Sequence, residues 1–403
     1  MRKIVYFSTF FQPEFSEYYL SHHTKGENLS ASTFSFSICK GLSSLTKKLQ
    51  VINIPPIGQF PLNYKRLHSK GGIFTMNDIE IESLKYSSIY LYQHYSLHFN
   101  LKKVLSKNLD VEQKYVFLFY SLIEPQIILT TLNFCKKHNI DAKYCLIIPD
   151  FIEDINSEKS FIRRIKTSIY RQLLSEIYDK MNGFIFLTEN MKERISLNKR
   201  PYAIVEGMFD TSSIRQMPTR LNKNKVILYS GMLHDKFGVR KLIDAFLLIK
   251  DESLRLMLCG SGDQEDYIKA CSLKDKRIIY KGIVNHEEVL KLQTEAFLLI
   301  NPRSSEGEYT KYSFPSKTME YLASGTPTLI YQLEGIPKEY YNYCYSIKDR
   351  QQDPILLSEY IMKICSMDNE VLRQKAEDAK SFIYRNKSAS AQCVKILELI
   401  NII

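Results

Sequence analysis

A segment late in the chain, from Phe314 to Pro327, carries the residues best suited to chemistry. It reads FPSKTMEYLASGTP, and it consists of a Pro-Ser-Lys turn, a short helix that contains Glu320, and a Gly-Thr-Pro stop. The strand-like run FLLINPR precedes it. A helix that begins after a strand and a loop points backbone N–H groups outward, and this arrangement favours phosphate. One helical turn further in, Glu320 offers a carboxylate to a pair of hydroxyls. Phosphate and diol recognition together are what a nucleotide-sugar site requires.

Two cations flank this helix start. Arg303 ends the strand-like run, where its guanidinium can donate two hydrogen bonds to a phosphate. Lys317 stands in the first turn, where a cation is unfavourable by a few tenths to about 1 kcal/mol unless an anion binds nearby. The alternatives are that Lys317 is an exposed surface lysine and that Glu320 belongs to a solvated helix face.

Other loops that follow strand-like runs carry further candidates. Gly231, in YSGM, would let backbone approach a ligand closely, although it could also serve only a tight turn. Gly260 begins GSGD, a pattern common in α/β loops that can simply start a helix. The long loop 301–316 contains Glu306 and Glu308.

The first half of the chain offers fewer candidates. Asp150 ends a strand-like run in IIPDF and is the one site candidate there. His94 and His98 lie in a Tyr-rich stretch and are expected to pack. No residue stands out as a catalytic base.

Strand-like apolar runs alternate with helical patterns, which predicts an α/β architecture with parallel sheets. In the first half we expect strands at 3–8, 49–54, 88–92, 115–119, 142–148, 183–187 and 203–206. In the second half we expect them at 226–229, 254–259, 278–281, 296–300, 328–330 and 344–347. Helical patterns fill most of the intervals.

The periodicity lapses at 210–225, which predicts a linker between two domains. The expected domains are 1–209 and 226–385, and a last helix within 386–403 is expected to pack back on the first. Ligands of open α/β sheets bind at the carboxyl ends of the strands. Two such sheets facing each other would share one central cleft.

Composition limits the classes of function. A chain of 403 residues predicts two domains, and no apolar run reaches the roughly 18 residues needed to span a bilayer. We interpret MRKIVYFSTFF as a first buried strand rather than a signal peptide. The eight cysteines show no CxxC spacing and indicate free thiols in a reducing cytoplasm. The pair His22–His23 has no further ligand at metal spacing, so no metal site is expected.

A formal net charge of +11 indicates an anionic partner: nucleic acid, an anionic membrane or a phosphorylated substrate. No zinc finger, RNP motif or Arg-rich stripe favours nucleic acid. Residues 160–178, SFIRRIKTSIYRQLLSEIY, form a basic amphipathic helix pattern that can rest on an anionic membrane. The alternative is a surface helix that packs on its own domain.

The second half resembles the nucleotide-binding domain of GT-B glycosyltransferases of the retaining family 4 type. The resemblance covers about residues 226–350 and rests on a set of motifs in the family's order: YSGML…FGVRKLIDAF, LMLCGSGDQEDYI, IIYKGIVNHEEVLKL, FLLINPR and FPSKTMEYLASGTPTL. The first half matches more loosely, through IIPDF, FIFLTENM and IVEGMFD. The set is specific, although no single motif is.

The resemblance implies roles for particular residues. Glu320 stands where the family's glutamate binds the donor ribose hydroxyls. Ser316, Lys317 and Gly231 stand where the family approaches the diphosphate. Arg303 and Lys317 would stabilise charge on the leaving group without a metal ion.

The chain also departs from the family pattern. Position 312 is Tyr where the family often has a second glutamate, so either Glu306 or Glu308 would contact the donor sugar or that contact would be absent. Met232 replaces the common arginine, and diphosphate charge would fall to Lys236, Arg303 or Lys317. The family's N-terminal Gly-Gly loop is missing.

These observations predict a cytoplasmic enzyme, peripheral at the inner face of a membrane. It would transfer a hexosyl group from UDP- or GDP-sugar to a glycan or lipid-linked acceptor with retention, in surface polysaccharide or glycoconjugate synthesis. The donor is a co-substrate, and no other cofactor is expected. The alternatives are a nucleotide-sugar epimerase of the same architecture and a non-catalytic basic binding protein. A dinucleotide-dependent oxidoreductase is disfavoured because no GxGxxG follows a first strand.

Overall fold

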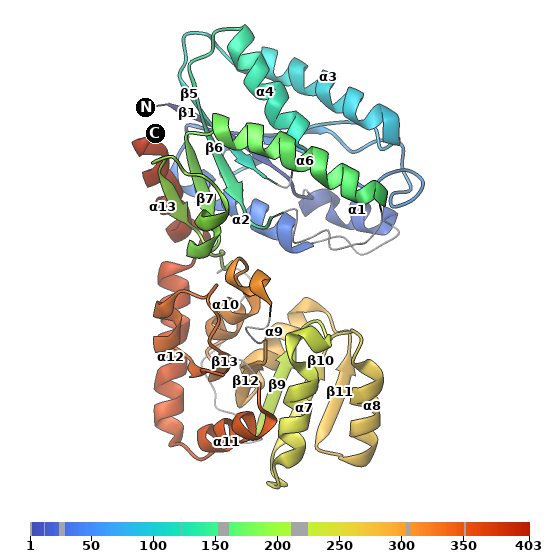
Figure 1. Ribbon diagram of the computed structural model, residues 1–403, viewed down its shortest axis with the longest axis vertical. Coiled ribbons are helices and arrows are strands. Elements are labelled where there is room, and N and C mark those ends of the chain that lie inside the picture. The colour runs from blue at the N-terminus through green and yellow to red at the C-terminus, as the bar shows by residue number, and fades with distance from the viewer. Residues whose placement is uncertain are drawn as a thin grey trace. The chain divides into compact units, whose positions relative to one another are not determined.

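The computed structural model divides the chain into two compact units, Met1–Met208 with Ala389–Ile403, and Phe209–Ser388. It describes residues 2–11, 13–23, 29–121, 123–151, 161–210, 225–303, 307–349 and 352–403. Most of the predicted linker and Glu306 lie outside these residues, as do the side chains of residues 161–169 in the predicted basic helix. Figure 1 traces the chain.

The N-terminal unit is built on an eight-stranded sheet. The strands in spatial order are β3 (Gly72–Met76), β4 (Ile79–Ser83), β2 (Leu49–Asn53), β1 (Lys3–Ser8), β5 (Tyr115–Tyr120), β6 (Ala142–Ile148), β7 (Gly183–Phe186) and β8 (Tyr202–Ile204). All neighbours are parallel except β3 and β4. The run YVFLFY of β5 is buried throughout, as a central parallel strand with both faces covered requires.

Helices cover this sheet on both faces. On one face α2 (Leu29–Leu45) packs against the last helix, α13 (Ala389–Ile402), and on the other α4 (Pro125–Lys137) packs against α3 (Tyr90–Asn108) and α6 (Phe161–Lys180) (Figure 1). The shorter elements are η1 (Pro13–Phe15), α1 (Ser16–His22) and η2 (Glu189–Arg194). The last helix therefore belongs to the N-terminal unit, although the rest of the second half does not.

The strand predicted at 88–92 is wrong. Residues 90–108 form α3, and the segment between β2 and α3 instead contains the hairpin β3–β4, which had not been predicted. Asn77 and Asp78 make the turn with φ of 51° and 64°, the left-handed values of a tight hairpin turn.

The second unit is a six-stranded, all-parallel sheet. The strands in spatial order are β11 (Ile278–Gly282), β10 (Arg255–Cys259), β9 (Val226–Ser230), β12 (Leu298–Asn301), β13 (Thr328–Tyr331) and β14 (Tyr345–Ile347). Its longer helices are α7 (Val239–Leu248), α8 (Glu265–Lys274), α9 (His286–Glu295), α10 (Ser316–Ala323), α11 (Pro354–Cys365) and α12 (Asn369–Asn386). Short 3-10 turns are η3 (Asp235–Phe237), η4 (Glu308–Lys311) and η5 (Lys338–Asn342).

Alternation along the strands builds two cores in this unit. Ile227 of β9 and Leu256 of β10 pack in a cluster that includes residues of α7 and α11, whereas Leu228 of β9 joins Leu299 and Tyr321 in a separate cluster. Because successive residues of a strand point to opposite faces, one run of apolar residues anchors helices on both sides. This double anchoring holds the strand ends in place for the site.

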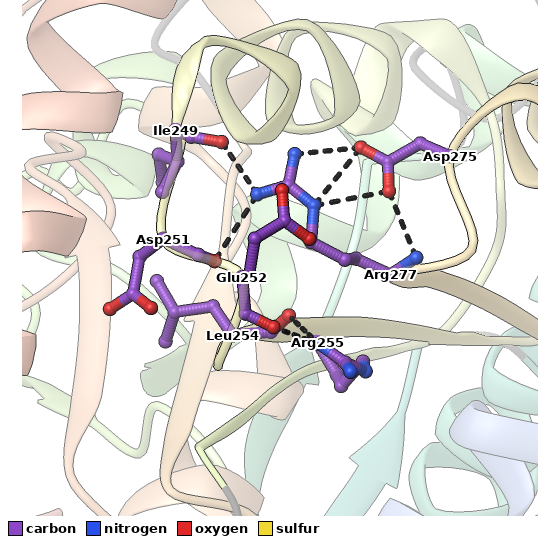
Figure 2. A network of polar contacts seen from close by, with 7 residues as sticks. All are labelled: Ile249, Asp251, Glu252, Leu254, Arg255, Asp275 and Arg277. Atoms are coloured by element: carbon purple, nitrogen blue, oxygen red, sulfur yellow. Dashed lines mark hydrogen bonds and ion pairs between the residues drawn. The ribbon is translucent and has the colours of Figure 1, made fainter.

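A polar network fastens the amino-terminal edge of the second sheet (Figure 2). The guanidinium of Arg277 donates to the Asp275 carboxylate at 2.7 Å and to the backbone carbonyl of Ile249 at 2.7 Å. It also reaches the carbonyl of Asp251 at 3.2 Å. Arg277 precedes β11, and Ile249 follows α7. The network thus ties the end of α7 to the start of the outer strand β11. It lies at the amino-terminal ends of the strands, whereas the predicted site lies at their carboxyl ends.

Candidate active site

Strand order creates a switch point in the second sheet. The chain runs from β9 outward to β10 and β11 on one side and then returns to β12 on the other side of β9. Loops after β9 and β12 therefore leave in different directions, and ligands of open α/β sheets bind in the crevice at such a point. Gly231 directly follows β9, and Arg303 follows β12. Two of the predicted site residues thus come to this switch point.

Gly231 lies against the start of α10. A methyl group in place of its hydrogen would collide with Cε of Lys317 and lie 3.1 Å from the Tyr229 hydroxyl. Its N–H donates to the carbonyl of Cys259 at 2.9 Å, which fixes the turn. A side chain at position 231 would therefore have to displace the end of the flexible Lys317 side chain, which extends from the first turn of α10 to the loop after β9.

Gly260 supports that turn from the neighbouring loop. Its φ is +132°, and a Cβ there would collide with the carbonyl oxygen of Gly231. Its N–H donates to the carbonyl of Gly282 at 2.8 Å. The structure therefore places Gly260 in backbone contact with Gly231. Asp263, further along the same loop, accepts from the backbone N–H of Asp235 at 2.9 Å rather than starting a helix, since α8 begins at Glu265.

The first turn of α10 is open to a ligand. Pro315 is the N-cap residue, and no side chain caps the helix. Ser316 is exposed and Lys317 is partly buried. At the end of β12, the amide of Asn301 donates to the Thr318 hydroxyl at 3.4 Å, which ties strand and helix together. An uncapped helix start that carries a cation favours an anion.

Glu320 lies one turn further along α10 and is held by a buried amide. Its carboxylate accepts a hydrogen bond from the side chain of Gln293, which is completely buried on α9. The same amide lies 3.1 Å from Oγ of Ser230, the last residue of β9, and can donate to it. The backbone carbonyl of Gln293 accepts from the Thr326 hydroxyl at 2.7 Å. Glu320 is thus oriented by a residue that is itself fixed on two sides.

Tyr321 adds a second tie between α10 and β9. Its hydroxyl accepts from the backbone N–H of Ser230 at 2.9 Å. Burial raises the pKa of Tyr321, and nearby charge, including that of Glu320, adds to the rise. The phenol therefore stays protonated and neutral, as a structural hydrogen-bonding group.

Sequence reasoning missed Gln293, Tyr321 and Ser230. The signal for Gln293 was present, because it stands three residues after Leu290 on the buried stripe of α9. A polar residue on a buried stripe must find hydrogen-bond partners. The partners themselves could not be named from the sequence.

Arg303 lies among aromatic rings beside the switch point. Its guanidinium is 5.3 Å from the ring centre of Tyr309 and 5.9 Å from that of Phe237. Burial raises the pKa of Tyr229, and the positive charge of Arg303 partly opposes this rise. Arg303 is therefore close to the loop after β9 as well as to η4.

Of the remaining predicted residues, two lie in the second unit and one in the N-terminal unit. Lys236 is exposed in η3, with its ammonium 5.1 Å from the ring centre of Phe237. Glu308 is exposed and begins η4. Asp150 belongs to the N-terminal unit. There the pKa of Tyr120 is raised, mainly by burial and further by the negative charge of Asp150.

The expectation that His94 and His98 pack is wrong, since both are exposed. Nδ1 of His94 lies 2.8 Å from the Glu124 carboxylate, and Nδ1 of His98 lies 2.8 Å from the Thr130 hydroxyl. Desolvation and then the Lys102 charge lower the pKa of His98. Both histidines line a pocket of about 510 Å³ within the N-terminal unit, formed by residues 59, 90, 94, 95, 98, 124–126, 170 and 173.

No group of three His, Cys, Asp or Glu residues in the described ranges is arranged to hold a metal ion. No helix of the part of the chain that the structure describes is both long and apolar enough to cross a membrane.

Residues 210–384 match the family model described as glycosyl transferases group 1. This match includes every site residue described above except Asp150 and the two histidines. A sequence search of curated proteins gave no match.

Solved structures resemble the whole chain. Sucrose-phosphate synthase from Thermosynechococcus elongatus aligns with a TM-score of 0.64 at 12% identity over 100% of this chain and 98% of its own. HepE of Anabaena in complex with UDP aligns with a TM-score of 0.61 at 11% identity over 100% of both chains. The lipopolysaccharide outer core galactosyltransferase WaaB aligns with a TM-score of 0.57 at 14% identity over 99% of both. The protein therefore has the GT-B fold, with two Rossmann-like units built on parallel sheets.

Proposed function

We propose that this protein is a retaining glycosyltransferase of the family 4 type that transfers a hexosyl group from a UDP- or GDP-sugar to an acceptor hydroxyl. One observation carries the proposal. The Glu320 carboxylate is held by buried Gln293 one turn inside a helix whose uncapped start touches Gly231. The proposal takes Glu320 as the group that binds a diol and the helix start as the group that binds an anion; their separation of one helical turn supports a ribose joined to a diphosphate.

Each residue then has a chemical role. Glu320 accepts hydrogen bonds from the ribose hydroxyls. The backbone at Gly231 and Ser316 and the side chain of Lys317 bind the diphosphate, with Arg303 and Lys236 adding positive charge. Donors aimed at developing charge contribute roughly 10²–10³ each to kcat in other enzymes. Glu308 is proposed to contact the donor sugar, and Gly260 supports the Gly231 turn.

The reaction breaks the bond between the anomeric carbon and the diphosphate oxygen and forms one from that carbon to the acceptor oxygen on the same face. The departing phosphate takes the acceptor proton, so no carboxylate nucleophile is needed. Cationic side chains and helix-start amides would balance the leaving-group charge without a metal ion. Asp150 is proposed to act on the acceptor side from the N-terminal unit.

Support for the donor class comes from the compared structures. HepE of Anabaena has been solved in complex with UDP and with UDP-glucose, which makes UDP the first nucleotide to test. The acceptor is proposed to be a glycan or a lipid-linked saccharide, in surface polysaccharide or glycoconjugate synthesis. We further propose a cytoplasmic protein that reaches the inner face of the membrane through residues 160–178.

The test begins with thermal unfolding in the presence of UDP, GDP and ADP, because a ligand that binds only the folded state raises its stability. Calorimetry then compares Glu320→Ala with Glu359→Ala, an exposed carboxylate of α11. Nucleotide affinity should fall at least tenfold only in Glu320→Ala. Equal affinity in the two variants would remove the site assignment.

Product analysis separates the alternatives. A transferase changes a UDP-sugar only when an acceptor or water takes the sugar, and the anomeric signal of the product reports retention. An epimerase converts the donor alone, and a non-catalytic protein converts nothing. Activity that persists in a metal chelator would agree with the proposed metal independence.

A further inference from the structure

Exposed apolar side chains gather on two segments of the N-terminal unit. The most exposed are Leu62, at 72%, and Leu91, at 84%. The full set, here called the apolar patch, is Phe60, Leu62, Leu67, Ile89, Tyr90, Leu91, Tyr92, Tyr95 and Phe99. Contiguous apolar surface of this kind marks a place where something binds, whereas single exposed apolar residues do not.

The two segments form one surface because the backbone joins them. Phe60 and Ile89 are bridge partners, and the N–H of Phe60 donates to the carbonyl of Ser88 at 3.0 Å. The N–H of Ser88 donates to the carbonyl of Leu67 at 2.9 Å. The loop that carries Leu62 is thus attached to the residues that lead into α3.

On α3 the outward face is aromatic where a surface helix is normally polar. Leu97, Leu101 and Val104 are among the residues that α3 buries. On the exposed side, the rings of Tyr92 and Tyr95 lie 5.6 Å apart, and that of Phe99 stacks 6.3 Å from Tyr95. These three residues recur at helical spacing and therefore line one stripe.

The two segments that carry the apolar patch are rich in basic residues, and the Glu124 carboxylate lies against α3 here, 2.8 Å from Nδ1 of His94. Residues 57–77 carry Lys65, Arg66 and Lys70, residues 84–109 carry Lys85, Lys102, Lys103 and Lys107, and neither stretch contains an Asp or Glu. The ammonium of Lys103 lies 4.3 Å from the ring centre of Phe99. Tyrosines and phenylalanines with interspersed lysines and arginines match the boundary layer of an anionic membrane.

We propose that the apolar patch and its basic flanks bind the surface of an anionic lipid bilayer. Protein interfaces are depleted in lysine, which argues against a protein partner. A nucleic acid is disfavoured because the most exposed residues, Leu62 and Leu91, offer no aromatic ring on which a base could stack. The apolar patch shares no residue with the basic helix 160–178, so the two proposed membrane contacts are made by different residues. The inference does not depend on the proposed enzyme activity, because lipid binding can be measured without substrate.

The first test is sedimentation of the full chain with vesicles of phosphatidylcholine alone or mixed in equal parts with phosphatidylglycerol. The patch variant carries Leu62→Ser, Leu91→Ser and Tyr92→Ser. The matched control carries Leu273→Ser, Ile283→Ser and Ile355→Ser, which removes exposed apolar side chains of the other unit (74%, 80% and 58% exposed). The patch variant should bind anionic vesicles at least tenfold more weakly, and the control should bind as the parent does.

A charge variant separates this surface from the general basic character of the chain. Lys65→Glu with Arg66→Glu should weaken binding to anionic vesicles more than Lys250→Glu with Lys274→Glu, which makes the same change in net charge on the other unit. Equal losses in the two variants, or a parent chain that ignores anionic vesicles, would overturn the proposal. A loss only in Arg171→Glu, on α6, would also overturn it.

The absence of tryptophan from the sequence allows a direct reporter. Leu91→Trp gives a single tryptophan in the apolar patch, and Leu273→Trp gives one in the other unit. Only the first should shift its emission to the blue when anionic vesicles are added. A shift that follows protein concentration without lipid would indicate a second copy of the chain on this surface and would overturn the lipid assignment.

Discussion

The side-chain amide of Gln293 on α9 donates a hydrogen bond to the Glu320 carboxylate on α10. The two residues come from different helices on the same side of the second sheet, and Gln293 also reaches the end of β9 through Ser230. A carboxylate that is already oriented binds a diol without losing further side-chain freedom. Gln293 is thus a positioning residue for the proposed ribose contact.

We expect Gln293→Leu to weaken UDP binding roughly threefold to tenfold, because ordering a freed side chain costs about 0.5–1.5 kcal/mol. Stability should change by less than about 1 kcal/mol, because the other side-chain atom, Oε1, is buried without a hydrogen-bond partner among the described residues. Calorimetry and thermal unfolding measure the two effects. Gln374→Leu is the control, since Gln374 donates to Asp378 at 2.9 Å on the exposed surface of α12. Unchanged UDP affinity in Gln293→Leu would reduce its role to core packing.

Gly231→Ala should lower transfer activity about hundredfold, because the new methyl group displaces Lys317 and small displacements at a reacting site have effects of that size. Gly282→Ala is the comparison, since a Cβ at Gly282 meets nothing within 4 Å and only its φ of +68° disfavours a side chain. That variant should lose about 1 kcal/mol of stability and keep its activity. Equal activities in the two variants would contradict the close approach of Gly231 to the ligand.

Lys317→Gln should change stability and binding in opposite directions. Without nucleotide, removing a cation from the first turn of α10 should stabilise the protein by a few tenths to about 1 kcal/mol. With UDP, affinity should fall at least tenfold as a charge-assisted contact is lost. Lys274→Gln, in the last turn of α8 where a cation is favourable, should slightly destabilise and leave affinity unchanged. A fall in both quantities for Lys317→Gln would indicate a structural lysine.

Asp275→Asn should destabilise the protein by about 1–3 kcal/mol at pH 7, because the Arg277 pair has side chains only 10% and 18% exposed. The hydrogen bond from Arg277 lowers the pKa of Asp275 below its usual value. A lowered carboxyl pKa contributes stability above the unfolded value of about 3.9 and loses it as pH falls through the folded pKa. The difference from the parent in urea unfolding should therefore shrink below about pH 4. Asp78→Asn, whose ion pair with Lys47 is exposed and screened by solvent, should cost much less stability than Asp275→Asn does.

The eight cysteines should react slowly in the folded protein, since all are buried and free. Burial raises the thiol pKa from 9.0 to about 11 at Cys135, Cys259 and Cys365, and to about 12 at Cys145 and Cys344. A thiol pKa of about 11 in place of 9 lowers the fraction of reactive thiolate about hundredfold at pH 8. Titration with a chromogenic disulfide should be slow in buffer and complete in guanidinium. A fast native thiol would show that one cysteine is open to solvent.

Local patterns predicted most of the strands, and the failures have physical causes. The run of β5 is apolar throughout, and those of β1, β6 and β9 are mostly apolar, because parallel central strands are covered on both faces. A strand was wrongly predicted at 88–92 because α3 exposes Tyr90, Leu91 and Tyr92. The start of this helix therefore lacks the polar face that normally indicates a surface helix. The hairpin β3–β4 had a readable signal in Asn77-Asp78 between alternating residues.

The sequence by itself determined the two α/β series and the presence of a cation, Lys317, and a carboxylate, Glu320, in one short helix after a strand and a loop, because strand runs, turns and helix starts depend on neighbouring residues. Only the tertiary structure decided that Gly231 touches Lys317 and that Gln293 holds Glu320. The reason is the strand order. After β10 and β11 on one side of β9, the chain crosses over and β12 pairs with the other side of β9. Residues distant in sequence then meet at one strand end, and no local pattern encodes that meeting.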